Sequence, residues 1–160
     1  MSLPDHLAPL REVDERFRDA DPALPNGFAE HAPMGAEALV RLGVDAGAVR
    51  AWAERHEPEP IDGSGPVATR RDELAARIED EGWRAVVATE VAGLAPFVGV
   101  HLFHGVIRTG HAVRTIVELD ADWSRRELAV ALAAWWDWAG QGERGTGDDD
   151  PPGDPRSAVL

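Results

Sequence analysis

The stretch from Pro96 to Leu119, PFVGVHLFHGVIRTGHAVRTIVEL, decides the fold class of this 160-residue chain. At about 100° per residue, its apolar side chains fall on nearly every side of a helix. They are Val98, Val100, Leu102, Phe103, Val106, Ile107, Val113, Ile116 and Val117. A helix that is apolar all round is usually buried inside its domain. The sequence therefore predicts a long central helix over residues 96–119.

Helical patterns also cover most of the remaining chain. They span about residues 9–20, 28–42, 45–56, 69–90 and 124–139. Asp45 is the predicted N-cap of the helix over 45–56, and Ser124 with Glu127 forms a predicted capping box at the last helix. No alternating runs of Val, Ile and Thr indicate strands. We therefore expect an all-α multi-helix bundle of about five to six helices.

Two segments lack a helical pattern. Residues 57–66, EPEPIDGSGP, hold three prolines and two glycines and are a predicted linker within the bundle. Residues 140–160 are rich in Gly, Asp and Pro and have almost no apolar content. Such a composition cannot offset the entropy of ordering the segment. We expect one helical domain over 1–139, followed by a disordered acidic tail over 140–160.

The composition excludes several functions. A net charge of −13 argues against binding to nucleic acid or to an anionic membrane surface. The chain has no cysteine, and all sixteen basic residues are arginine. Thiolate catalysis, Cys-based zinc sites, Schiff-base chemistry and a P-loop lysine are therefore excluded. With neither a targeting pattern nor a spanning segment in the sequence, we expect a soluble cytoplasmic protein.

Four nitrogen-bearing side chains gather on one side of the predicted central helix. His101, His104, Arg108 and His111 fall within an arc of about 80°. On a buried helix they need partners, because an unpaired buried polar group is costly. A rise of about 4.5 Å between His101 and His104 allows one metal ion to reach both, whereas His104 and His111 lie about 10 Å apart along the axis.

The partners of these side chains remain open at this point. They are carboxylates such as Glu37, Glu90 or Glu118 in a purely structural network, a metal ion, or a ligand. Arg108 suits an anionic or phenolic ligand oxygen. A further candidate is His31, in the first turn of the helix over 28–42, where a histidine is more often a capping or surface residue than a ligand.

Three stretches together resemble the questin oxidase-like family. The stretch HAPMGAEALVRLG (31–43), followed by a helix ending in WAERHEP (52–58), resembles the opening of that family. HLFHGVIRTGHAVR (101–114) resembles its second signature, a His-Gly-x-Ile-Arg element on a long helix. The resemblance covers about residues 25–139, which correspond to the N-terminal half of a typical member.

The resemblance implies an oxidoreductase that opens the rings of polycyclic aromatic ketones such as anthraquinones. Family members are described as NADPH-dependent Baeyer–Villiger-type oxygenases, and a relative as a non-haem iron dioxygenase with histidine and carboxylated-lysine ligands. By their matches to the two signatures, His31 and His104 are candidate iron ligands, and Arg108 is a candidate catalytic residue that holds a substrate oxygen. The sequence has no GxGxxG fingerprint, so NADPH rests on the resemblance alone.

The chain also departs from the family pattern. It has no lysine to carboxylate, and the acidic tail stands where the C-terminal half would begin. Three explanations stay open: a truncated or decayed member, a half-protein that completes its site by pairing, or a member that uses local carboxylates. The expected partners are an aromatic small-molecule substrate and a second chain, either a copy or a complementary one. The alternatives to an enzyme are a catalytically incomplete helical half-protein that acts as a structural or binding partner, and a carrier of hydrophobic ligands.

Overall fold

A computed structural model describes residues 5–24 and 29–145, and this part of the chain is all-α, as predicted. Its helices are α1 (Ala8–Phe17), α2 (Ala32–Arg41), α3 (Ala46–Ala53), α4 (Pro66–Glu81), α5 (Trp83–Leu94), α6 (His104–Glu118) and α7 (Asp122–Gly145). Short 3₁₀ turns cover Asp5–Leu7, Ala95–Phe97 and Val100–Phe103. The predicted tail began too early, because α7 continues to Gly145, and residues 146–160 lie outside the described residues.

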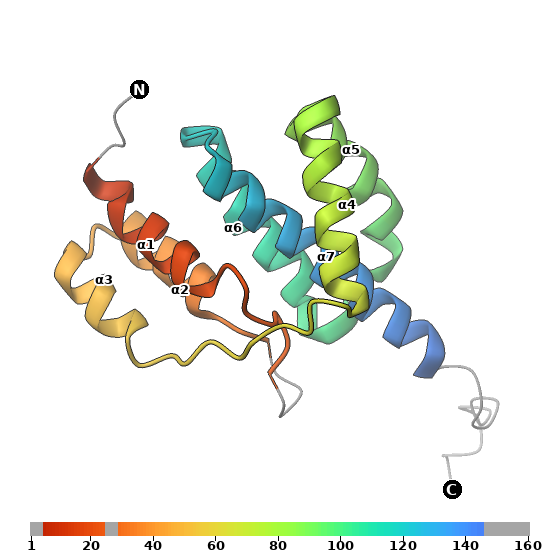
Figure 1. Ribbon diagram of the computed structural model, residues 1–160, viewed down its shortest axis with the longest axis horizontal. Helices are drawn as coiled ribbons and strands as arrows, with labels where there is room; N and C mark the ends of the chain where they lie inside the picture. Colours follow the sequence, from red (N-terminus) through yellow and green to blue (C-terminus); the bar gives the residue numbers. More distant parts are fainter. Residues whose placement is uncertain (1–4, 25–28, 146–160) are drawn as a thin grey trace, which may run out of the picture.

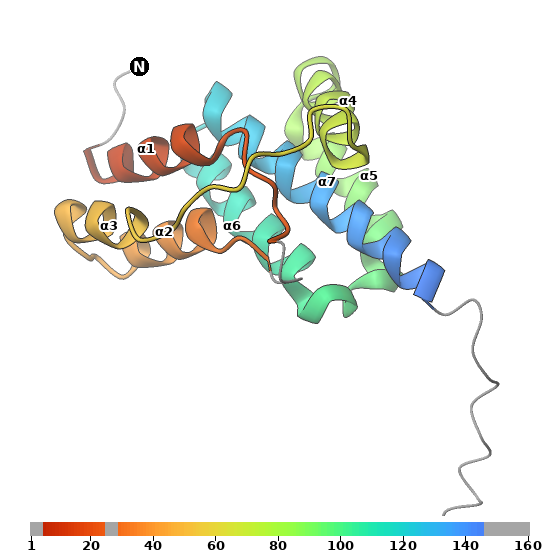
Figure 2. The same ribbon diagram turned by 60° about the horizontal axis from the view of Figure 1, so that its bottom comes forward.

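The helices form two groups on either side of α6 and α7 (Figures 1 and 2). Helices α1 to α3 lie on one side and the α4–α5 hairpin on the other, with α6 and α7 crossing between them. The central helix is α7, not the predicted helix over 96–119. Leu128, Leu132 and Trp135 of α7 are buried, whereas Ile107 and Val117 of α6 are 45% and 61% exposed.

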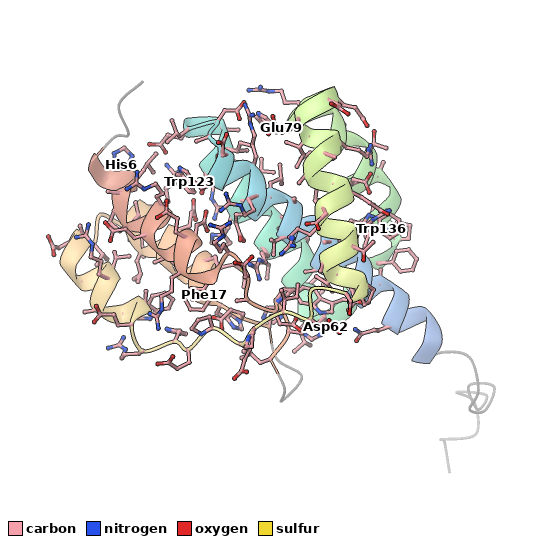
Figure 3. The ribbon with its side chains drawn as sticks, viewed as in Figure 1. His6, Phe17, Asp62, Glu79, Trp123 and Trp136 are labelled. Atoms are coloured by element: carbon pink, nitrogen blue, oxygen red, sulfur yellow. The ribbon has the colours of Figure 1, made fainter. Side chains whose placement is uncertain are left out.

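Two hydrophobic clusters share the α6–α7 layer. One joins α4 and α5 to α7 through Leu74, Val86 and Leu132. The other packs α1 and α2 around Trp123, at the start of α7, and includes Phe17. Figure 3 shows Trp123 beside α1. The N-terminal helices are therefore held to the rest of the domain through the start of α7.

Local sequence signals explain several helix boundaries. Asp45 is the N-cap of α3, as predicted, and its Oδ1 accepts hydrogen bonds from the amides of Gly47 at 2.8 Å and Ala48 at 3.3 Å. The single helix predicted over 69–90 is wrong. Gly82 has φ +83°, a left-handed value that glycine adopts without a steric penalty, and it separates α4 from α5. The predicted linker is an extended connection in which Ala20 pairs with Pro60.

The predicted capping box at Ser124 does not form. Helix α7 begins two residues earlier, at Asp122. The Ser124 Oγ accepts a hydrogen bond from the Ala121 amide at 3.0 Å, and its single hydrogen faces the carbonyl oxygens of Leu119 at 2.7 Å and Ala121 at 2.9 Å. The Glu127 side chain turns into the bundle to meet Arg108. Ser124 therefore bonds to the start of α7 from within its first turn, and Glu127 pairs with Arg108 instead of with the backbone.

No helix in residues 5–24 and 29–145 combines the length and the apolar character that a membrane crossing requires.

Candidate functional site

The two histidines selected by the resemblance lie against each other. His31 immediately precedes α2, and His104 is the first residue of α6. Their Nε2 atoms are 2.9 Å apart, and the rings meet edge to face with centroids 4.8 Å apart. The fold thus joins residues 73 positions apart in the sequence.

A backbone carbonyl fixes the tautomer of His104. Its Nδ1 lies 2.6 Å from the carbonyl oxygen of His101, which only accepts hydrogen bonds, so Nδ1 carries the hydrogen. In the neutral ring, Nε2 of His104 is then an acceptor, and it accepts a hydrogen bond from Nε2 of His31 at 2.9 Å when no metal is bound. Metal-binding histidines almost always donate their other ring N–H to a carbonyl or carboxylate in this way.

An unusual backbone conformation puts that carbonyl in place. His101, Leu102 and Phe103 have φ values of 48°, 54° and 67°, the left-handed region that non-glycine residues rarely adopt. Each such residue costs about 1–2 kcal/mol, and strain of this kind clusters at functional sites. Helix periodicity predicted that His101 and His104 share one face of a helix. They do not, because α6 begins only at His104.

The His101 ring is held away from the pair. It stacks on Trp138 at 4.4 Å between centroids, with an interplanar angle of 12°. Burial lowers the pKa of His101, and the nearby His104 lowers it further. The His101 ring packs on α7, and its backbone carbonyl is the part that contacts His104.

An open pocket of about 360 Å³ adjoins the histidine pair. It is lined mainly by apolar groups from α2, α3 and α6: His31, Met34, Gly35, Ala38, Trp52, His104, Ile107 and His111. This volume lies within the range of small-molecule sites. The indole of Trp52 supplies a flat apolar surface beside the two imidazoles. Trp52 and Met34 were not among the predicted site residues, although both lie within the stretches that carry the resemblance.

Glycines beside the two histidines let tryptophan rings approach the helices. A side chain on Gly35 would place its Cβ 2.6 Å from Cζ2 of Trp52, and one on Gly105 would lie 2.8 Å from Cβ of Trp135. Real Cβ atoms essentially never come closer than 3.0 Å to another heavy atom. Gly35 therefore admits Trp52 to the pocket wall, and Gly105 sets the close crossing of α6 and α7.

His111 also borders the pocket and is oriented by a buried carboxylate. Glu37 is 3% exposed and accepts hydrogen bonds from His111 Nδ1 at 2.6 Å, Arg114 Nη2 at 2.9 Å and Arg41 Nε at 2.9 Å. With its hydrogen on Nδ1, the neutral imidazole has an accepting Nε2. The carboxylate partner that the sequence offered as one alternative is thus present for His111. Among the residues that the structure describes, no carboxylate is placed to share an ion with the pair formed by His31 and His104.

The Glu37 network predicts a loss of stability in acid. Burial alone would raise the pKa of Glu37, but the hydrogen bonds from His111, Arg114 and Arg41 outweigh burial and hold the pKa far below its ordinary value of 4.5. A carboxyl with a lowered folded-state pKa stabilises the fold above its unfolded-state pKa and loses that contribution as the pH falls through the folded value. We expect Glu37→Gln to be less stable than the wild type at pH 6, with a smaller difference at pH 3. Urea unfolding at both pH values measures this, and a difference that does not change with pH would contradict it.

Arg108 does not line the pocket, contrary to its predicted role. Its guanidinium is 2% exposed and pairs with Glu127 through Nε at 2.9 Å and Nη2 at 3.1 Å. Burial alone would lower the pKa of Arg108, and the charges of Glu127, Asp14 and Glu30 raise it. The residue turns toward α7 and neutralises buried carboxylates, which helix periodicity alone could not indicate.

The histidine pair meets the first requirement of a metal site. One ion with metal–nitrogen bonds of about 2.1 Å reaches two nitrogens up to about 4.2 Å apart, and these lie 2.9 Å apart. Imidazole is a common ligand of iron, zinc and copper. Among the residues that the structure describes, no group of three or more His, Asp or Glu is placed to hold one ion. His31 and His104 could thus supply two ligands of a metal site, and a complete site needs more.

Comparison of the chain with protein-family models, with curated proteins and with solved structures finds no match.

Proposed function

We propose that this chain is a questin oxidase-like oxidoreductase that opens the ring of a polycyclic aromatic ketone at a non-haem iron held by His31 and His104. The observation that carries the proposal is the 2.9 Å approach of the two Nε2 atoms, in rings that come from two separate signatures. The His101 carbonyl supports it, because it presets His104 in the tautomer that binds metal.

The pocket fits the proposed substrate class. A polycyclic ketone is flat and apolar, and Trp52, Met34 and Ile107 offer apolar surface beside the histidines. An aromatic substrate stacked on Trp52 would gain about 0.5–1.5 kcal/mol beyond its area burial. His111, oriented by Glu37, can accept the proton of a substrate hydroxyl through Nε2. Iron, when bound, supplies the activation of O₂.

Oxygen uptake tests the proposed reaction. Protein loaded with Fe²⁺ without air is mixed with a hydroxyanthraquinone and O₂, with and without NADPH. Dioxygenation consumes one O₂ per ring opened and no NADPH, whereas a Baeyer–Villiger reaction also consumes one NADPH and releases water. We expect ring opening without NADPH, because the sequence has no dinucleotide fingerprint.

Matched histidine variants separate the site from non-specific iron chemistry. His31→Ala and His104→Ala should abolish ring opening. His6→Ala should retain it, because His6 pairs with Glu118 at the opposite end of α6 (Figure 3). Folded, iron-loaded wild type that opens no ring would contradict the proposal.

The second candidate is a catalytically incomplete helical half-protein that serves as a structural or binding partner. The specific observation in its favour is that the described residues supply only two metal ligands. This candidate predicts that the wild type and both histidine variants are equally inactive and equally stable.

A further inference from the structure

The histidine pair is open on its outer side. His31 is exposed and His104 half-buried, and the pocket beside them is open to solvent. Two imidazoles make half of a four-ligand set, and no third His, Asp or Glu of the described residues completes it. The remaining ligands can therefore approach from outside the domain.

Exposed apolar side chains occur in residues 98–107, beside His104 in the sequence, and one of them, Ile107, lines the pocket. Val98, Leu102, Phe103 and Ile107, which we call the α6 face, are 42%, 72%, 53% and 45% exposed. Val98 directly follows the Ala95–Phe97 turn, Leu102 and Phe103 belong to the left-handed segment, and Ile107 lies in the first turn of α6. This part of the chain is at the lower edge of the domain in Figure 2. The strained backbone that aims the His101 carbonyl at His104 thus also presents Leu102 and Phe103 to solvent. Four large apolar side chains exposed within residues 98–107 make this part of the chain a candidate interaction surface.

The α6 face carries no net charge. None of its residues, and none of the residues that line the adjoining pocket, is Asp, Glu or Arg. The whole chain has a net charge of −13, so two copies repel each other over most approaches. Contact through this face brings apolar and imidazole groups together and keeps like charges out of the contact. A two-fold axis beside the pair would also place four imidazoles around one point.

We propose that a second copy of this chain docks on the α6 face and that the two copies share one metal ion, each supplying His31 and His104. The inference rests on the metal site of the proposed function and adds to it how the site is completed. A two-fold contact needs no further ligand type, because each copy supplies the half that its partner lacks.

The size of the α6 face indicates that the metal controls the pairing. At about 150–200 Å² per large apolar side chain, its four half-exposed members offer roughly 300–400 Å². A stable interface needs about 800 Å² from each partner. The apolar contact alone is therefore too small for a stable dimer. Four metal–nitrogen bonds would supply the rest, so we expect monomers without metal and dimers with it.

Sedimentation equilibrium during a Co²⁺ titration tests the inference. The full chain should be a monomer in a chelator and become a dimer as Co²⁺ is added, with the transition complete at about half an equivalent per chain. X-ray absorption of that sample should count about four nitrogen ligands per ion. His31→Ala and His104→Ala should stay monomeric and bind Co²⁺ at least about 100-fold more weakly. His6→Ala should behave as the wild type.

A surface variant separates docking from metal binding. Leu102→Glu places like charges in the contact at a side chain that is 72% exposed, so the fold is retained. It should remain monomeric at half an equivalent of Co²⁺. Wild type that binds one Co²⁺ per monomer would overturn the shared site and leave the proposed metal pair standing. A dimer that persists in chelator would also overturn the shared site. Wild type that binds no Co²⁺ would overturn both the shared site and the proposed metal pair.

Discussion

Gly105→Ala is expected to lower the free energy of unfolding by about 3 kcal/mol. The new Cβ would lie 2.5 Å from Cδ1 and 2.8 Å from Cβ of Trp135, and closer still to Cγ. These atoms belong to the base of a side chain that is 1% exposed, so rotation of the ring cannot relieve the overlap. Helices α6 and α7 would have to separate at the point where they cross. Urea unfolding followed by far-UV circular dichroism measures the change.

Two other helical glycines serve as controls for Gly105. Gly35→Ala meets the far end of the half-buried Trp52 ring, which can shift, so we expect a loss of about 1 kcal/mol or less. Gly110→Ala meets nothing within 4 Å and should gain up to about 1 kcal/mol from helix propensity. Equal stability of Gly105→Ala and the wild type would show that α6 and α7 do not cross as described.

Arg108→Met is expected to destabilise the fold by about 3 kcal/mol while leaving metal binding unchanged. Removal of the guanidinium leaves Glu127 charged and without its partner in the interior, whereas the histidine pair lies outside this contact. Adding Glu127→Gln to Arg108→Met should recover part of the loss, because the uncompensated charge is then gone.

An ion pair on the surface is the control for the loss of stability expected from Arg108→Met. Arg50 pairs with Glu12 at 2.8 Å on the surface, and Arg50→Met should change stability little. Thermal and urea unfolding compare the variants, and a metal titration follows each. If Arg108→Met keeps wild-type stability but no longer binds metal, Arg108 acts in the proposed site, as the sequence predicted, and not in the ion pair with Glu127.

The helices were largely predictable because their signals are local. Asp45 caps α3 through its own neighbours, and residues 57–66 connect helices as their proline and glycine content predicts. The break at Gly82 was not predictable, because a helical glycine and a left-handed one look alike in sequence. The importance of α7 was also missed. Its many alanines contribute little to hydrophobicity, yet they allow α4 and α6 to pack closely against it.

The candidate site could be predicted only in part. Helix periodicity placed His101, His104, Arg108 and His111 on one face, whereas the structure turns His101 onto Trp138, Arg108 onto Glu127 and His111 onto Glu37. The left-handed turn at 101–103 could not be predicted, because none of its three residues is glycine. The pairing of His31 with His104 depends on how α2 and α6 meet, which no local pattern contains. The residue pattern had already marked His104 and His31 as separate candidates, and only the resemblance combined them as ligands of one ion.

We propose above that His31 and His104 together hold a metal ion. The most direct test is the iron content of protein purified without air, measured for the wild type, His31→Ala, His104→Ala and the control His6→Ala. We predict iron in the wild type and in His6→Ala, and its loss from the other two variants with the fold intact. Iron-free wild type, or iron retained by both His31→Ala and His104→Ala, would contradict the claim.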